Sequence, residues 1–422
     1  MAHVPLTRML FVSFLWAWGA ASTSGQEPKP TDPTPRITLE EALNRAMSIH
    51  PDLALGEADV RIAEGETVRA RTRLYNPELS ADYGRASAPG RQASNQDFGI
   101  EQTIELGGKR GKRMSVAAAG LEAARAWRAR VRSLVALRVR RAYMLAVVAN
   151  MRLASAHEAE AIADEVKSFA DQRLELGAGT RLEVNVAGAA RGRAVADRLA
   201  AEQTVRATRA ELAAAVGDRT NTALTPSTDA LEWSVPTLTE DEFVARALSS
   251  RGDLIAAGAD VAAAEAEVAL AKALGVPDVA ARVGRSREGI DQQTANWIGV
   301  SLSVPLFNRN QGGQAVAQAQ MDRARTSETA LRQIVERDAR VAFARYRFAR
   351  EAQDAFDRGV VDKLSENLVL VRESLRAGKI GLLEFNVVRR DLVETRRAFL
   401  DAMSEVVEAR AALDAAAGGP WE

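Results

Sequence analysis

Residues 296–306 read NWIGVSLSVPL, and from Ile298 onward the apolar side chains fall on every second position. Alternation over about 9 to 11 residues is typical of a β-strand with one apolar and one polar face, and strands that cross a membrane have this length. Three other segments alternate in the same way, at residues 78–86, 97–106 and 278–285. A half-buried hairpin of a water-soluble domain would show the same pattern, so both interpretations stay open at this point.

The four alternating segments form two predicted β-hairpins, 78–106 and 278–306, with polar loops expected at 87–96 and 286–295. Lipid does not tolerate an open sheet edge, and the smallest barrels that close need about eight strands. The strands of one chain are too few for closure, so several copies must combine if these strands cross a membrane. Two copies would supply about eight strands, and three copies about twelve.

The chain contains one structural unit twice, because its landmarks superimpose after a shift of about 200 residues. The matching positions keep their order along the chain: Thr38 with Thr239, Leu53 with Leu254, Tyr143 with Tyr346, and Gly177 with Gly378. We therefore expect a first repeat at 37–217 and a second repeat at 237–418. The connector between them, 218–236, is rich in Thr, Ser and Pro.

Each predicted hairpin lies between helical segments. A helix of about 20 residues precedes it, and a long helical hairpin follows it, at 110–216 and 310–417. Residues 121–176 contain neither Gly nor Pro, and a helix of about 60 residues is roughly 90 Å long. A rod of that length has no place in a globular core, so it indicates a coiled coil, a scaffold or a tube.

Small apolar side chains recur at every seventh position along this segment. They are Val135, Ala142, Ala149, Ala156, Ala163 and Ala170. A strict seven-residue repeat keeps one seam against a neighbour and bends the helix into a left-handed supercoil. Together these patterns predict a mainly α-helical fold with a small membrane β part, built from a duplicated unit of a long antiparallel helical hairpin plus a β-hairpin.

The N-terminus has the features of a secretory signal peptide at 1–25. Arg8 supplies the positive charge, and residues 9–21 form the apolar run. This run of about 13 residues is shorter than the roughly 20 that a membrane-spanning helix needs, although a short membrane anchor remains the alternative. Residues 26–36 include four prolines and predict an extended tether.

Composition argues against several classes of function. The chain has no cysteine, which excludes disulfides, thiolate sites and a diacylated lipid anchor. The 56 basic and 56 acidic residues cancel, so nothing points to nucleic acid. His50 and His157 lie far apart, and the basic run 107–113 lacks the spacing of a phosphate-binding loop. No catalytic triad is evident, so we expect neither an enzyme nor a cofactor nor a resident metal.

The sequence resembles the TolC-like outer-membrane factor family over residues 37–417. Thr38–Leu43 and Pro51–Leu53 resemble the family's opening motif, and Glu105–Arg110 resembles its strand-to-helix turn. Pro305–Gly312 is the counterpart of that turn in the second repeat. These two turns are similar to those of the cobalt–zinc–cadmium, or CzcC-like, branch. Many relatives carry a lipid anchor, which this chain lacks.

The resemblance implies a homotrimer whose twelve-stranded β-barrel lies in the outer-membrane lipid of a Gram-negative bacterium and continues as an α-helical periplasmic tunnel. It implies a passive channel that docks onto a periplasmic adaptor and an inner-membrane, proton-driven RND pump. The branch implies heavy-metal cations such as cobalt, zinc and cadmium as cargo. Drug efflux and type I protein secretion remain open, and so does a soluble periplasmic coiled-coil scaffold.

The resemblance also places the adaptor-docking surface at the turns between the long helices. Thr180, with Glu183 three residues later, predicts a capping box, whereas Gly381 stands where Ser or Thr is common, so its helix should be capped less firmly. The residues that match the periplasmic tips are Arg173, Gly177, Thr180, Leu182, Glu183, Arg376, Gly378, Leu383 and Glu384. The alternative is that these residues do no more than shape the turns.

Overall fold

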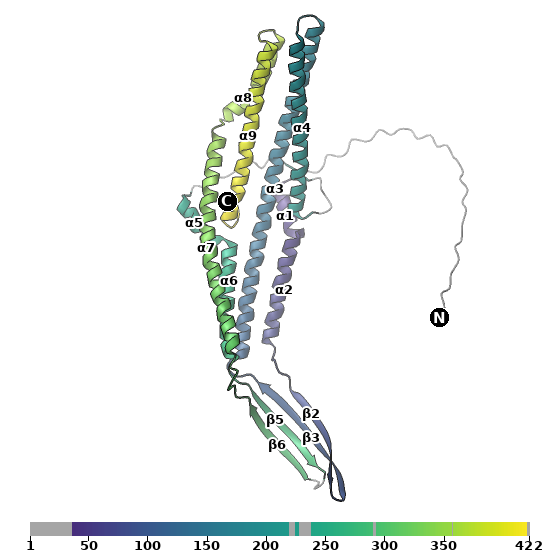
Figure 1. The fold of residues 1–422 in the computed structure, drawn as a ribbon, viewed down its shortest axis with the longest axis vertical. Coiled ribbons are helices and arrows are strands. Elements are labelled where there is room, and N and C mark those ends of the chain that lie inside the picture. Colours follow the sequence, from purple (N-terminus) through teal and green to yellow (C-terminus); the bar gives the residue numbers. More distant parts are fainter. Residues whose placement is uncertain (1–35, 219–223, 228–237, 290–292, 357, 420–422) are drawn as a thin grey trace, which may run out of the picture. The chain divides into compact units, whose positions relative to one another are not determined.

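The computed structural model describes residues 36–218, 224–227, 238–289, 293–356 and 358–419. The expected signal peptide and all but the last residue of the expected tether lie outside this part of the chain. No helix in the described residues is both long and apolar enough to span a membrane. Figure 1 shows the sheet at one end of the helices and the two turns between long helices at the other end.

The two repeats run through the same order of long elements. The first contains β1 (Arg36–Ile37), α1 (Leu39–Ile49), α2 (Pro51–Arg71), β2 (Glu78–Ala88), β3 (Arg91–Ile104), α3 (Lys109–Glu175) and α4 (Arg181–Val216). The second, after β4 (Thr225–Pro226), contains α5 (Glu240–Ser250), α6 (Gly252–Ala273), β5 (Val279–Glu288), β6 (Gln293–Leu302), α7 (Gln311–Asp354), α8 (Arg358–Arg376) and α9 (Leu382–Ala416).

Equivalent residues begin the two repeats. The side chain of Thr38 accepts from the backbone N–H of Glu41, whose carboxylate accepts from the backbone N–H of Thr38. Thr239 and Glu242 form the same reciprocal capping box at α5. Such a box satisfies two backbone donors that a helix would otherwise leave unpaired. The duplicated sequence therefore specifies the same local structure twice.

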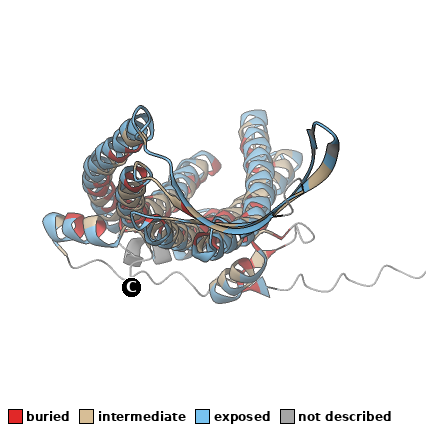
Figure 2. Cartoon of the chain, turned by 90° about the horizontal axis from the view of Figure 1, so that it is seen from below, coloured by how far each residue is buried: buried red, intermediate tan, exposed pale blue. Residues whose placement is uncertain are grey.

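The four long strands form one antiparallel sheet in the order β2-β3-β5-β6. The central pairing, β3 with β5, joins the two repeats and runs from Gln96 opposite Arg287 to Ile104 opposite Val279. Figure 2 shows that the sheet bends into an open arc. Among the described residues, the outer strands β2 and β6 each have one neighbouring strand, so both edges of the sheet are open there.

The loops expected at 87–96 and 286–295 are wrong, because the strands continue through most of these residues. β2 runs to Ala88 and β3 starts at Arg91, which leaves the two-residue turn Pro89-Gly90 with Gly90 at φ 77°. Most of these additional strand residues are polar, so they do not show the alternation of apolar side chains from which the strands were predicted. β6 in turn ends at Leu302, before the expected residue 306, since Pro305 has no N–H for a ladder hydrogen bond.

The first long helix, α3, has 67 residues and a length of about 100 Å. It packs against α2, α4, α6 and α9. The counterpart in the second repeat is divided, since α7 ends at Asp354 and α8 begins at Arg358. An uninterrupted helix was expected there. Gly359, in the first turn of α8, weakens the helical preference at this point.

Equivalent tyrosines stand in the cores of the two repeats. Tyr143 is fully buried, with its hydroxyl 3.1 Å from the Ile37 carbonyl and 2.9 Å from that of Ser227. These contacts attach the short β1–β4 pair to α3. Tyr346 packs in the matching cluster between α5, α7 and α9. The helical half of each repeat therefore has a small apolar core of its own.

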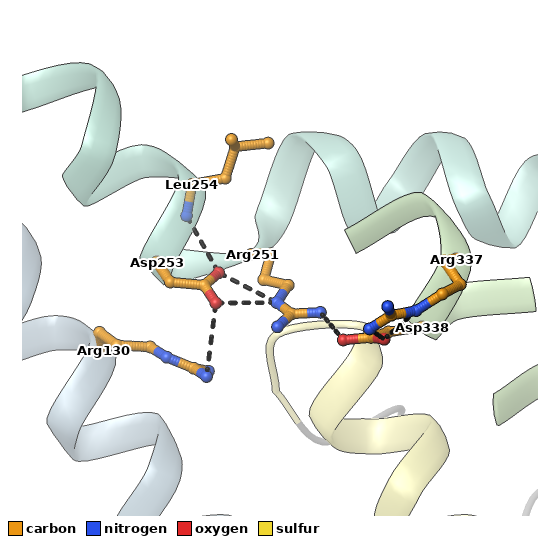
Figure 3. A network of polar contacts seen from close by, with 6 residues as sticks. All are labelled: Arg130, Arg251, Asp253, Leu254, Arg337 and Asp338. Carbon is orange, nitrogen blue, oxygen red and sulfur yellow. Dashed lines mark hydrogen bonds and ion pairs between the residues drawn. The ribbon is translucent and has the colours of Figure 1, made fainter. Parts of the chain in front are cut away.

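Charged side chains connect α3, the start of α6 and α7 (Figure 3). Arg251, just before α6, contacts Asp253 at 3.0 Å and Asp338 of α7 at 3.6 Å. Asp253 also lies 3.6 Å from Arg130 of α3, and burial lowers the pKa of the Arg130 guanidinium. This network links α3 of the first repeat to α6 and α7 of the second.

Candidate functional site: an apolar sheet face and two helical turns

The register of the sheet gathers most of the apolar side chains of the four strands on one face. Leu79, Ile100, Val283 and Ile298 stand opposite one another across the sheet as one row. The other apolar members of this face are Ala81, Tyr83, Phe98, Ile104, Val279, Ala281, Val300 and Leu302. The prediction of one apolar face, made from alternation alone, is confirmed.

This apolar face is exposed. Leu79 is 79% exposed, Ile298 85% and Val300 71%. No described helix or loop packs on these side chains, which distinguishes the hairpins from half-buried hairpins of a water-soluble domain. A contiguous exposed apolar surface marks a place where protein or lipid must cover it. The alternation and strand length of the face match those of a membrane strand.

The opposite face of the sheet is polar. Asp82 stands opposite Asp97, and Glu78 stands opposite Glu101, whose carboxylate lies 3.8 Å from Arg282. Trp297 covers two glycines of this face, Gly99 and Gly284, which have no side chain to displace its ring. The sheet therefore separates an apolar surface from one that carries carboxylates.

The junction between sheet and helices contains a partly buried ion pair that crosses the repeats. Lys109, the first residue of α3, lies 2.7 Å from Asp278 beside β5. The same carboxylate oxygen accepts from the backbone N–H of Leu106 at 3.1 Å. Within the run 107–113, Gly107 and Gly108 form a turn with positive φ, whereas the basic residues from Lys109 onward belong to the first turns of α3 and not to the turn. The pairing of Lys109 with Asp278 depends on tertiary structure and could not be predicted.

The turn between α3 and α4 contains the capping box that the sequence predicts. Gly177 has φ 71°, and Thr180 and Glu183 form the reciprocal capping box. Arg173 Nη2 donates to the carbonyl of Ala178 at 2.8 Å, which ties the turn to the end of α3. Leu182 projects here with 61% of its surface exposed.

The turn between α8 and α9 is held differently. Gly378 has φ 68°, and Gly381 is the N-cap of α9 without any side-chain hydrogen bond, as expected. Leu383 is exposed, and Glu384 lies in the first turn of α9. Arg376 forms an ion pair with Glu165 of α3. This contact, and a shared apolar cluster of residues from α3, α4, α8 and α9, bring the two turns to the same end of the molecule (Figure 1).

The two histidines that the structure describes take a structural and a surface position. His50 is 5% exposed, and its Nδ1 accepts from the backbone N–H of Asp52 at the start of α2, a cap that sequence reasoning missed. His157 lies within α3. Among the residues that the structure describes, no three His, Asp or Glu side chains gather in a way that could hold a metal ion.

Comparison with known proteins identifies the family of this architecture. A family model described as outer membrane efflux protein matches the chain twice, at residues 42–218 and 243–419. The chain belongs to the outer membrane efflux protein family. Each match covers most of one of the two repeats, so the duplication is a property of the outer membrane efflux protein family.

Two curated relatives of this outer membrane efflux protein carry metal-resistance names. The nickel-cobalt-cadmium resistance protein NccC of Alcaligenes xylosoxydans xylosoxydans is 30% identical over 306 residues, or 69% of this chain and 67% of NccC. The cobalt-zinc-cadmium resistance protein CzcC of Cupriavidus metallidurans is 24% identical over 404 residues, or 95% of each chain. These matches confirm the resemblance to the CzcC-like branch.

A solved structure has the same fold. The outer-membrane channel OprN superimposes with a TM-score of 0.73 at 20% identity, over 91% of this chain and 90% of OprN. Likeness at this identity establishes the fold alone. This likeness confirms the predicted architecture, which is mainly helical. In that architecture a small β-sheet extends a helical tunnel.

Proposed function

We propose that the chain is the outer-membrane channel of a tripartite, proton-driven efflux system and that it conducts heavy-metal cations passively to the exterior. The observation that carries this proposal is the exposed apolar face of the sheet, which includes the strongly exposed Ile298 and Val300. A surface of this kind is stable where lipid covers it. If lipid covers the apolar face, the carboxylates on the opposite face line the water-filled channel.

Assembly into a homotrimer follows from the edges of the sheet. β2 and β6 each lack one neighbour, and an unpaired strand edge in lipid leaves backbone donors and acceptors without partners. Pairing of β6 in one copy with β2 in the next removes these edges, and three copies supply about twelve strands, enough for a barrel. In the helical part, the outer helices α2 and α7 expose apolar side chains that a neighbouring copy would cover, namely Leu55, Ile62, Val316, Ile334 and Val341.

The cargo and partners are proposed from the relatives. NccC and CzcC are named for resistance to nickel, cobalt, zinc and cadmium, and this chain has their family's architecture over nearly its whole length. We assign cobalt, zinc and cadmium as cargo and a periplasmic adaptor with an inner-membrane RND pump as partners. The two helical turns, with Thr180, Glu183, Gly378 and Glu384, are the proposed tips where the adaptor docks.

Deletion of the gene tests the cargo. The deletion strain should lose resistance to cobalt, zinc or cadmium and keep its resistance to drugs, and the unmodified gene should restore it. A drug phenotype without a metal phenotype would favour the drug-efflux channel. Recovery of the protein as a periplasmic monomer would favour the soluble scaffold instead.

A further inference from the structure

The four helices that reach the sheet each place an exposed basic side chain at that end of the molecule. These residues are Arg71 in the last turn of α2, Arg110 in the first turn of α3, Lys272 in the last turn of α6 and Arg309 just before α7. Within the part of the chain that the structure describes, none of the four pairs with a carboxylate. The guanidinium groups of Arg110 and Arg309 donate to backbone carbonyls instead.

The same helices pair their arginines farther from the sheet. Arg128 of α3 lies 3.1 Å from Glu57 of α2, and Arg325 of α7 lies 2.7 Å from Glu265 of α6. These paired side chains are exposed as well. Exposure alone therefore does not explain why the four basic residues beside the sheet have no acidic partner.

The helix dipole accounts for only two of the four charges. A cation is favourable near the C-terminus of a helix, as for Arg71 and Lys272, and unfavourable near the N-terminus, as for Arg110 and Arg309. Neither α3 nor α7 has an acidic residue in its first turn. Six other helices do have one there, namely α1, α2, α4, α5, α6 and α9. The charges at the starts of α3 and α7 therefore point to a partner outside the helices.

These charges stand where the exposed apolar face of the sheet ends. The last row of that face contains Ile104, Val279 and Leu302. Each of the four basic residues is six or seven residues away from the end of the strand that its helix adjoins. Phe307, which is 91% exposed between β6 and Arg309, extends the apolar surface toward them. A lipid layer that covers the apolar face would place its headgroups beside these charges.

A hollow of about 670 Å³ among α2, α3 and α6 marks the other side of the helices. Arg113 in its lining pairs with Glu105, which continues the polar side of β3 by alternation. Leu270 lines the hollow on α6, and Lys272, two residues later, lies on the opposite side of that helix. Arg71 stands between two residues of α2 that line the hollow, so it also points away. These two charges therefore lie on the side of the apolar sheet face.

We propose that Arg71, Arg110, Lys272 and Arg309 form a basic belt that binds the phosphate groups of anionic phospholipids in the periplasmic leaflet of the outer membrane. The inference rests on the proposed function, because it takes the apolar sheet face as the surface that lipid covers. Basic side chains at a membrane surface are attracted to anionic headgroups. A protein partner is a poorer occupant, because the belt directly continues the surface assigned to lipid.

Native mass spectrometry of the detergent-solubilised channel tests the belt. Phosphatidylglycerol and phosphatidylcholine with the same acyl chains are titrated separately, and the lipids bound to each channel are counted. The unmodified channel should bind the anionic lipid about fivefold more tightly than the zwitterionic lipid. Replacement of all four belt residues by glutamine should reduce this preference to less than about twofold and leave phosphatidylcholine binding unchanged, since only the anionic lipid gains from the positive charges.

Two variants serve as controls. The first replaces four exposed basic residues that lie within the helices and have no ion pair among the described residues: Arg61→Gln, Arg132→Gln, Arg206→Gln and Arg323→Gln. It removes the same charge as the belt variant and should keep the lipid preference. The second exchanges arginine for lysine, and lysine for arginine, at the four belt positions and should keep the preference too. Heat-resistant oligomers on a gel show that each variant has folded.

The outcomes separate the inference from the proposed function. If the unmodified channel binds both lipids equally, or the first control loses the preference as far as the belt variant does, the belt is wrong and the channel stands. If the belt variant binds lipid normally but no longer binds the periplasmic adaptor, the surface belongs to a protein partner and the belt is again wrong. If the unmodified chain forms no heat-resistant oligomers in the outer membrane, the proposed function is wrong and the belt falls with it.

Discussion

Lys109 Nζ lies 2.7 Å from Asp278 Oδ1, so the first residue of α3 in one repeat is bound to the residue immediately before β5 in the other. The lysine side chain is 7% exposed and the aspartate side chain 20%. The sheet is thereby connected to the helices across the repeats. A substitution at Lys109 or Asp278 should therefore change how the sheet is oriented on the helices. It should also lower the stability of the protein.

Removal of the carboxylate should be strongly destabilising. Asp278→Ala removes the hydrogen-bonded ion-pair partner of the buried ammonium of Lys109, and we expect the free energy of unfolding to fall by about 3 kcal/mol. Denaturant unfolding followed by tryptophan fluorescence measures this loss. Glu122→Ala, which breaks an exposed ion pair with Arg125, is the control and should cost less than about 1 kcal/mol. A loss at Asp278 no larger than the control would contradict the buried pair.

A charge on the apolar face of the sheet should block membrane assembly. Val300 belongs to the exposed apolar face, and its neighbour Ser301 points to the polar face. Val300→Asp should abolish heat-resistant oligomers in the outer-membrane fraction, because the carboxylate would enter lipid. Ser301→Asp adds the same charge on the other face and should assemble normally. Equal behaviour of the two variants would mean that lipid does not cover the face.

The two helical turns should respond in opposite directions to changes at their caps. Thr180→Ala removes the N-cap of α4 and should destabilise that turn by about 1 kcal/mol. Gly381→Ser supplies the missing side-chain acceptor at α9 and should slow amide exchange in its first turn. Hydrogen–deuterium exchange across both turns measures these changes. Faster amide exchange near Leu383 in the serine variant would show that the backbone of this turn requires glycine at position 381.

Acid should weaken the two equivalent capping boxes. Hydrogen bonds from the backbone N–H and then the side chain of Thr38 lower the pKa of the Glu41 carboxyl, and Thr239 has the same effect on Glu242. A lowered pKa adds stability above the unfolded-state value, and this stability is lost as the pH falls through the folded-state value. The double variant Glu41→Gln/Glu242→Gln should therefore lose less stability than the unmodified chain between pH 5 and 3, measured by denaturant unfolding. Parallel pH profiles would argue against the boxes.

The sequence predicted most accurately those features that depend on local periodicity. Alternation located the apolar face that includes Ile298, and the Thr180–Glu183 spacing predicted its capping box, because each involves residues close together in the chain. Strand residues such as Gln92, Ser94 and Gln96 were missed because polar side chains carry no apolar signal, although the strand pairing continues there.

Contacts between residues that are far apart in the chain could not be predicted from the sequence alone. The contact of Lys109 with Asp278 depends on which helices and strands become neighbours, and no local pattern encodes that. The break between Asp354 and Arg358 lies in a segment with only a single glycine nearby. The roles of the tip residues remain predictions, since a turn and a docking surface use the same side chains.

The most direct test of the account joins the two edges of the sheet between copies. Within one chain β2 and β6 are separated by two strands, a distance of about 14 Å that a disulfide cannot bridge. With Ser80→Cys in β2 and a single cysteine scanned through residues 295–301 of β6, at least one pair should oxidise to covalent trimers on a non-reducing gel. Monomers at every position in the scan, from protein recovered in the outer membrane, would contradict a barrel shared among copies.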